Sequence, residues 1–482
     1  MRLLDSVLTT MGLSQPFRRF LGELLMLLVI VPGRATFLNL SRYSGYAEKT
    51  FRRWFRRKVD WAELNVTAIR AVVPGDHESV LAFDPSFVPK SGKATAGLGR
   101  FWNGCAGRAE PGLEMNALAW VDVTANTAYT LSAELTPPEP VAAAGAGATA
   151  AEAEAPAEGK AEPKGKGKGK AEPKGKGKGK GKGKGKGKGK GKGKGKAKGK
   201  AKGKGKAKSR AKAEGRAKAE GKAKAEGVET SRVDAYLAHL QRVIPHHDLV
   251  TLRYLTADGY FGKVKFVDGV KALNLELISK LRRDADLRYL YEGPYAGRGR
   301  PQLYDGKVDL SQRERFTPVA SPDPDLLLET AVVYAPRLRR RLRIVVVTHR
   351  HHRGVAILFS TDLDLDPVTL YRYYVARFQI EFLFRDSKQF AGLTHCQARD
   401  GAALTFHTNA SLTAVSLSKL QAVQTFGQLP VPFSMASIVR RCFNEYFLKK
   451  ILTCLAEGRS LAENSPDYEN LCNHGVIHPV AA

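Results

Sequence analysis

Three acidic residues stand at places in the chain where a carboxylate could hold a metal ion. Asp84 follows the apolar run 80–83, and Asp258 comes shortly after the apolar run 249–255. Glu381 lies in a segment with a helical pattern. Carboxylate oxygens suit Mg²⁺, and a pair of such ions can activate an attacking oxygen and stabilise a leaving oxygen at a phosphodiester. A single Asp after a strand is more often a cap or turn residue, so neither aspartate alone establishes this chemistry.

The segment around Glu381 brings further polar side chains to one helix face. Asp366 and the proline after it are typical of a helix start, and the helix should run to about Phe390. At 100° per residue, Tyr374, Arg377, Glu381 and Lys388 fall at about 0°, 300°, 340° and 320°. One acid among two cations and a phenol suits a phosphate group. The spacing leaves two other interpretations open, a solvated charge stripe and an i,i+4 ion pair within the helix.

The pattern Tyr-x2-Arg-x3-Glu-x6-Lys resembles the signature of the bacterial insertion-sequence DDE transposases of the YREK group. The surrounding segment 374–399 is similar to that family almost throughout. Segment 83–93 resembles the family's first acidic motif, and segment 256–261 resembles its second. The three motifs occur in the family's order, and the resemblance covers roughly residues 79–135 and 230–410.

This resemblance implies an α/β fold, a ribonuclease H-like mixed sheet flanked by helices, with a β insertion. The Leu- and Arg-rich pattern of residues 1–75 adds an N-terminal helical domain. It implies that the first strand, the fourth strand and a late helix deliver the catalytic, metal-binding residues Asp84, Asp258 and Glu381. The cofactor would be two Mg²⁺ ions, with Mn²⁺ as an alternative. The resemblance also assigns DNA contacts to Tyr374, Arg377 and Lys388.

Other charged residues lie close to these motifs. Lys90 and Lys93 follow the first acid and could contact DNA, with ordinary exposed lysines as the equal alternative. Asp362 and Asp364 are expected in a solvated approach to the catalytic helix, which Asp366 should cap.

A histidine cluster and the tryptophans bear on alternative chemistry. His349, His351 and His352 are expected at a hairpin tip, because no acid or cysteine stands near them at ligand spacing. Relatives can use a tryptophan of the β insertion to stack on a flipped base. The four tryptophans here lie outside the insertion, which places a base-flipping step and a hairpin intermediate in doubt: Trp54, Trp61, Trp102 and Trp120.

The positive charge of the chain is concentrated in one low-complexity segment. Residues 151–227 hold 29 of the 78 Lys and Arg but 8 of the 47 acids, so they carry 21 of the 31 net positive charges. Alternating small and cationic residues cannot bury enough apolar surface to offset the backbone entropy of folding. This composition predicts a disordered insert that binds DNA irrespective of its sequence, or a repeat without a role.

The remaining chain divides into segments of different pattern. Residues 37–57 suggest a helix-turn-helix with its turn at Gly45, or a helix pair that packs on its own domain. The strand-like and helical runs predict these boundaries: a helical DNA-binding domain at 1–75, the first part of the catalytic core at 76–138, the Lys/Gly/Ala-rich insert at 139–228, the second part of the core at 229–292, a β-rich insertion at 293–362, the catalytic helix region at 363–410 and a C-terminal helical region at 411–482.

The sequence therefore predicts a transposase that binds terminal inverted repeats and joins them to target DNA. A homodimer around paired DNA ends follows from the resemblance. The apolar run 24–31 is too short to span a membrane, and five scattered cysteines suit a reduced, cytoplasmic, nucleoid-associated protein. Two alternatives are a domesticated or inactive DNA-binding derivative and a ribonuclease H-like nuclease without strand transfer.

Overall fold

The computed structural model describes most of the chain outside the charged insert. The described residues are 2–138, 231–295, 297–351, 354–427, 433–463 and 465–477. By its contacts the chain divides into two units, Met1–Ala155 with Glu229–Ala482, and Pro156–Val228. All described residues belong to the first unit, and the insert predicted at 139–228 lies outside them.

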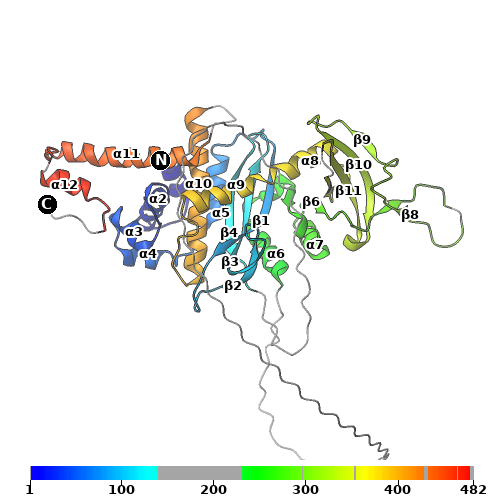
Figure 1. Cartoon of the computed structure of the whole chain (residues 1–482), viewed down its shortest axis with the longest axis horizontal. Helices are drawn as coiled ribbons and strands as arrows, with labels where there is room; N and C mark the ends of the chain where they lie inside the picture. The colour runs from blue at the N-terminus through cyan, green and yellow to red at the C-terminus, as the bar shows by residue number, and fades with distance from the viewer. Residues whose placement is uncertain are drawn as a thin grey trace, which may run out of the picture. The chain divides into compact units, whose positions relative to one another are not determined.

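Five strands form a mixed sheet around β1 (Ser79–Pro89) (Figure 1). On one side, β1 pairs antiparallel with β3 (Arg108–Asp122), which pairs antiparallel with β4 (Thr127–Leu135). On its other side, β1 pairs in parallel with β5 (Tyr254–Ala257), which pairs in parallel with β6 (Glu276–Leu281). The order β4-β3-β1-β5-β6 is a three-strand meander followed by two strands parallel to the first, and this ribonuclease H-like arrangement confirms the predicted fold class.

Further strands extend this sheet beyond β6. The first to join is β12 (Val355–Ser360), which pairs antiparallel with β6. The sheet then continues, each strand antiparallel to the one before it, through β11 (Arg340–His349), β10 (Leu326–Ala335), β7 (Arg288–Leu290) and β8 (Tyr304–Lys307). Two short strands pair elsewhere in the sheet, β2 (Gly99–Asn103) with β3 and β9 (Thr317–Val319) with β10.

Helices precede, interrupt and follow the strands, and several begin at capped residues. Ser231 and Asp234 form a reciprocal capping box at one helix start. Asp366 and Asp400 each accept a hydrogen bond from a backbone N–H of the first turn. The helices are α1 (Arg2–Thr10), α2 (Gln15–Ile30), α3 (Phe37–Arg42), α4 (Glu48–Trp54), α5 (Trp61–Arg70), α6 (Arg232–Val243), α7 (Val264–Ala272), α8 (Pro367–Ala376), α9 (Gln379–Phe390), α10 (Gly401–Phe426), α11 (Met435–Ala456) and α12 (Pro466–Cys472).

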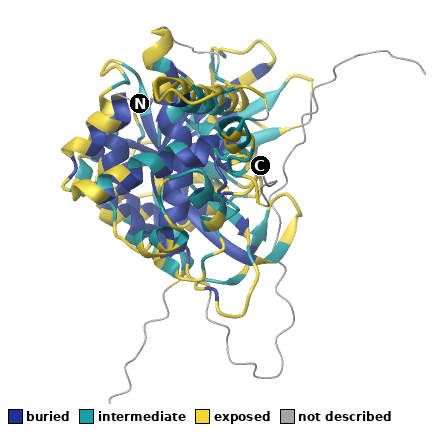
Figure 2. Ribbon diagram, turned by 90° about the vertical axis from the view of Figure 1, so that its left-hand side faces the viewer, coloured by how far each residue is buried: buried dark blue, intermediate teal, exposed yellow. Residues whose placement is uncertain are grey.

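The two faces of the central sheet are covered by different helices. Successive residues of a strand point to opposite faces, so Phe83 and Asp84 identify the two sides. The ring of Phe83 packs against Tyr236 of α6 and Phe266 of α7. The Asp84 face is covered by α9, and α5, α9 and α10 lie together on that side (Figure 1). Buried residues gather where these helices meet the sheet (Figure 2).

The free edge of β4 is closed by side chains rather than by another strand. Asn409 of α10 accepts from the N–H of Ala133 at 2.8 Å and donates to its carbonyl at 2.7 Å. Asn65 of α5 donates to the carbonyl of Leu131, which is the extra residue where the register of β4 shifts. Lys419 of α10 donates to the carbonyl of Ala128. Polar helix residues thereby satisfy an edge that would otherwise be open to another chain.

Two elements that precede the β-rich insertion differ from their sequence predictions. A strand predicted over residues 249–255 begins only at Tyr254, because Leu249–Leu252 forms a 3-10 turn and Arg253 has a φ of 57°. The sequence pattern of residues 262–282 also favours a single helix, and that prediction is wrong. There α7 ends at Ala272, Asn274 takes a φ of 58°, and β6 follows because its buried residues complete the sheet.

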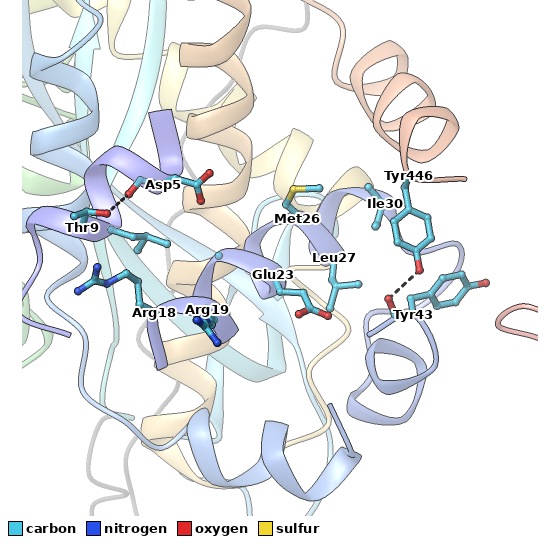
Figure 3. Close-up of a pocket in the computed structure, with 12 residues that line it drawn as sticks. Asp5, Thr9, Arg18, Arg19, Glu23, Met26, Leu27, Ile30, Tyr43 and Tyr446 are labelled. Atoms are coloured by element: carbon cyan, nitrogen blue, oxygen red, sulfur yellow. Dashed lines mark hydrogen bonds between the residues drawn. The ribbon is translucent and has the colours of Figure 1, made fainter. Parts of the chain in front are cut away.

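The N-terminal helices meet α11 around a cavity of ≈ 440 Å³ (Figure 3). Arg18, Arg19 and Glu23 of α2 line one side, and burial raises the pKa of Glu23. The hydroxyl of Tyr446 on α11 donates to the carbonyl of Tyr43 at 3.0 Å. The lining includes none of the three acids predicted for catalysis. Of the helices in the described ranges, none is long and apolar enough to cross a membrane.

Candidate active site around Asp84, Asp258 and Glu381

Asp84 lies at the middle of β1, directly after four fully buried apolar residues. Its side chain is 17% exposed and points to the α9 face of the sheet. Burial raises the pKa of Asp84 to about 8, Arg377 opposes this rise, and Asp258 and Glu381 add to it. Asp84 therefore has the electrostatic surroundings of a carboxylate that lacks a full positive counter-charge.

Asp258 follows the parallel strand β5 and lies beside Asp84. The register pairs Phe83 with Ala257, so the next position along each strand places the two aspartates next to each other. Neighbouring strands are about 4.8 Å apart, and aligned residues of a parallel pair point to the same face, so both side chains lie on one face of the sheet. Asp258 Oδ1 accepts from the N–H of Tyr260 at 2.8 Å, and its carbonyl accepts from the hydroxyl of Ser279 at 2.6 Å. These bonds hold the second acid in place.

Glu381 lies in the first turn of α9, just after a break in the predicted helix. The helix predicted from Asp366 to about Phe390 is two helices, α8 and α9, which meet at Arg377 and Phe378. Backbone bonds tighten there, and the N–H of Glu381 donates to the carbonyl of Phe378, three residues earlier. The helical direction continues through the junction, so Arg377 and Glu381 stay on one face.

Arg377 lies among the acids. Its Nη2 donates to Glu381 Oε1 at 3.2 Å, and its Nη1 is 3.9 Å from Asp84 Oδ1. The guanidinium carbon is 5.7 Å from the centroid of the Tyr374 ring. The i,i+4 ion pair that the sequence left as an alternative is thus present, and Arg377 also reaches the first acid.

Tyr374 and Lys388 flank this group. Burial raises the pKa of the Tyr374 hydroxyl, and Arg377 opposes the rise. Lys388 Nζ donates to the hydroxyl of Ser86 at 2.9 Å, and burial lowers the pKa of Lys388. The structure therefore brings Tyr374, Arg377 and Lys388 to the side of the acids, as the predicted helix face required. The sequence reasoning missed Ser86, although it stands two residues after Asp84 and so shares its strand face.

The two lysines after the first acid take different positions. Lys90 is half-buried, and its ammonium group donates to the carbonyl of Cys396. Burial lowers the pKa of Lys90. Lys93 lies exposed in the loop after β1. Of these two lysines, only Lys93 has the exposed position that both a DNA contact and an ordinary surface lysine require.

The carboxylates fit a hard divalent cation by their chemistry. Asp84 on β1 and Glu381 on α9 lie within ion-pair distance of Arg377, and Asp258 after β5 adds to the negative charge around it, so the acids already act on one positive charge. In this arrangement, with the guanidinium inserted, no group of three or more His, Cys, Asp and Glu side chains in the described ranges is close enough to hold a metal.

The rival clusters occupy structural positions. His349 ends β11 and His351 lies in the connection to β12, 3.2 Å from Asp325, as expected for a hairpin tip. His352 lies outside the described residues. Asp366 caps α8 as predicted. Asp362 was expected in a solvated position and is instead buried, where it accepts bonds from Arg253 and Tyr254.

The proposed helix-turn-helix segment forms α3 and α4 (Figure 1). Phe51 of α4 is fully buried, and its ring packs on Phe20 of α2 and Phe37 of α3. Arg52 and Arg53 point outward as exposed residues. The pair therefore packs on its own domain while it keeps a basic outer face, and both sequence interpretations remain compatible with it.

Comparisons with known proteins identify two family models that match parts of the chain. Residues 12–170 match a family model described as DDE superfamily endonuclease, and residues 229–417 match one described as Transposase DDE domain. The first match contains Asp84, and the second contains Asp258 and Glu381. None of the curated proteins matches the chain. Among solved structures, the piggyBac transposase synaptic complex with hairpin DNA is similar at 12% identity and a TM-score of 0.37, over 100% of this chain and 82% of that one.

Proposed function

The chain belongs to the DDE transposases, and we propose that it is the transposase of a bacterial insertion sequence, with Asp84, Asp258 and Glu381 as its catalytic carboxylates. The observation that carries this proposal is the parallel pairing of β1 and β5. It places two aspartates 174 residues apart in sequence at adjacent positions, with Glu381 beside them.

DDE transposases typically use divalent metal ions, and we propose two Mg²⁺ ions, or Mn²⁺, at these carboxylates. Such a pair supplies a deprotonated nucleophile and relieves charge on the leaving oxygen. The chain's part is to orient the oxygen donors on rigid elements. Asp84 is fixed by β1, Asp258 by its bonds to Tyr260 and Ser279, and Glu381 by the start of α9.

The groups beside the acids support DNA as the substrate. Tyr374, Arg377 and Lys388 offer a hydroxyl and two cations on the side of the acids, which suits backbone phosphates of a transposon end. Lys93 is exposed on the loop after β1 and could add a phosphate contact, whereas Lys90 would first have to release its carbonyl partner. We assign recognition of the terminal inverted repeats to the basic face of α4.

The remaining features of the proposal follow from the family. A homodimer would hold two paired ends and a target DNA, and the protein would act in the cytoplasm at the nucleoid. Two other functions predict different products. A ribonuclease H-like nuclease would cut without joining, and a domesticated or inactive derivative would bind ends without cutting.

The decisive test incubates the full chain with Mg²⁺ and DNA that carries the ends of the element. Products in which the cut 3′ ends are joined to a second DNA support the transposase. Cut but unjoined ends favour the nuclease, and bound but uncut ends favour the inactive derivative. Asp84→Asn, purified in the same way, is the matched control, and it should give neither cut nor joined products because it lacks one proposed catalytic carboxylate.

A further inference from the structure

Arg377 is enclosed by the groups that the proposed function assigns to metal binding. Its side chain is 13% exposed and lies within ion-pair distance of both Asp84 and Glu381. Burial lowers the pKa of Arg377, but Asp84, Tyr374 and the other acids more than offset this and raise it above its ordinary value. The guanidinium therefore supplies positive charge directly to the acid cluster.

The contacts of Arg377 are nevertheless incomplete. The 3.9 Å separation from Asp84 is too long for a hydrogen bond, so within the described part of the chain Glu381 is the one carboxylate that accepts a hydrogen bond from Arg377. Its buried Nε has no hydrogen-bond partner within the described part of the chain. A permanent buried Arg–carboxylate pair usually uses two parallel N–H bonds. Charge rather than fitted geometry therefore holds this side chain among the acids.

We propose that Arg377 is the resident counter-ion of the acid cluster in the metal-free protein, and that it must leave the cluster before a divalent ion can bind. This inference rests on the proposed function, since it takes Asp84 and Glu381 as metal ligands. A guanidinium and a divalent ion cannot both occupy the space between these carboxylates. Once displaced, Arg377 remains beside Tyr374 and can pair with a DNA phosphate instead.

One side chain would thus couple metal binding to DNA binding. A phosphate that draws the guanidinium away from Asp84 and Glu381 strengthens metal binding. By thermodynamic linkage, metal strengthens binding of that phosphate by the same factor. In the absence of DNA, Arg377 should therefore weaken the affinity of the site for divalent ions.

The test is a titration of the full chain with Mn²⁺ alone, without DNA. Binding is monitored by calorimetry or by the electron paramagnetic resonance signal of free Mn²⁺. Arg377→Gln removes the charge and keeps hydrogen-bonding groups, and should bind Mn²⁺ about tenfold more tightly than the wild type, which corresponds to about 1.4 kcal/mol. Arg377→Lys keeps a cation and should stay close to the wild type. Arg385→Gln is the matched control on α9, because Arg385 is exposed and pairs with Asp386 instead.

The outcomes separate this inference from the proposed function. If Mn²⁺ binding is lost in Asp84→Asn but Arg377→Gln binds no more tightly than the wild type, Arg377 is not a competing counter-ion, and the proposed metal site stands. If the wild type shows no Mn²⁺ binding that depends on Asp84, the metal site and the inference both fail. Arg377→Ala repeats the comparison should the Gln variant fold poorly, as judged by its thermal unfolding.

Discussion

The ammonium group of Lys388 on α9 donates a hydrogen bond to the hydroxyl of Ser86 on β1, with 2.9 Å between Nζ and Oγ. The two residues are 302 positions apart in sequence, and Ser86 shares a strand face with Asp84. This bond ties the helix that carries Glu381 to the strand that carries the first acid. It also keeps the Lys388 ammonium group at the side of the site, where burial partly desolvates it and lowers its pKa.

Lys388→Ala should weaken binding to the transposon ends and make it less dependent on salt. If Lys388 exchanges Ser86 for a DNA phosphate, its loss lowers the slope of log affinity against log salt by about 0.9. Fluorescence anisotropy at several salt concentrations measures this slope. Ser86→Ala should leave the slope unchanged, and so should Lys271→Ala, whose ammonium pairs with Glu276 on the surface. An unchanged slope in Lys388→Ala would show that this lysine is purely structural.

Changing each predicted metal ligand to its amide should abolish cleavage while end binding persists. Asp84→Asn, Asp258→Asn and Glu381→Gln keep the shape of the side chain but remove the charge that a divalent ion requires. Cleavage in Mg²⁺ and gel-shift binding are measured on the same preparations. Asp364→Asn is the control, since Asp364 is an exposed acid near α8. Substantial cutting by Glu381→Gln would remove Glu381 from the site.

The sequence was sufficient to place the two aspartates after strands, but it did not predict the contact of Arg377 with Asp84. Apolar runs before Asp84 and Asp258 predicted strands, and the parallel register then brings the two side chains together. Helical periodicity also placed Arg377 and Glu381 on one face. Periodicity cannot decide whether that face meets phosphate or carboxylate, because this depends on which strand lies opposite. The contact between Arg377 and Asp84 is such a long-range outcome.

The prediction of one helix over residues 262–282 failed because a single residue takes a left-handed backbone conformation. The apolar residues of 262–282 are compatible with one helix, but Asn274 adopts a left-handed conformation that ends α7 and starts β6. Burial of Leu277 and Ile278 in the sheet outweighs helical propensity there. Asp362 was misjudged for a related reason, since its partner Arg253 lies 109 residues away. Local patterns contain no information about such pairs.

Deletion of residues 151–227 should leave the catalytic unit folded and able to cut. The secondary-structure elements on either side of the insert are complete without it, because β4 ends at Leu135 and Ser231 caps the start of α6. The deletion removes 21 net positive charges, so affinity for unrelated DNA should fall and should depend less on salt. Thermal unfolding, cleavage and salt titrations check the three parts. Loss of folding in the deletion protein would show that the insert is not a surface addition.

Asn409→Ala should destabilise the protein strongly, because it leaves two buried backbone groups of β4 without partners. The N–H and the carbonyl of Ala133 both bond to this side chain at a buried position. An unsatisfied buried group costs about 1–3 kcal/mol, so the loss of partners for two groups should lower the free energy of unfolding by about 2–6 kcal/mol. Ser418→Ala on the same helix is the control, since its hydroxyl bonds only to Ala414 of α10. Denaturant unfolding of both variants measures the difference.

His239 should make the protein sensitive to acid. Its ring is fully buried, Nδ1–H donates to Asn116 Oδ1 at 2.6 Å, and Nε2 accepts from the hydroxyl of Ser132 at 2.7 Å. Asn116 Nδ2 donates to Thr136, which turns the amide oxygen toward the ring and fixes the neutral imidazole. Burial lowers the pKa of His239 to about 4 from its ordinary value of 6.5.

Below pH 6.5 the unfolded chain takes up a proton at His239 that the folded chain does not bind until about pH 4. The stability contributed by the neutral ring is therefore present above pH 6.5 and is lost as the pH falls through this window, by at most about 1.4 kcal/mol per pH unit. Carboxylates titrate in the same range, so the test compares the wild type with His239→Gln by denaturant unfolding at several pH values. The variant should be less stable at pH 7.5, and its stability should fall less steeply with acid by about one proton. Parallel curves for the two proteins would show that His239 is protonated in the folded state.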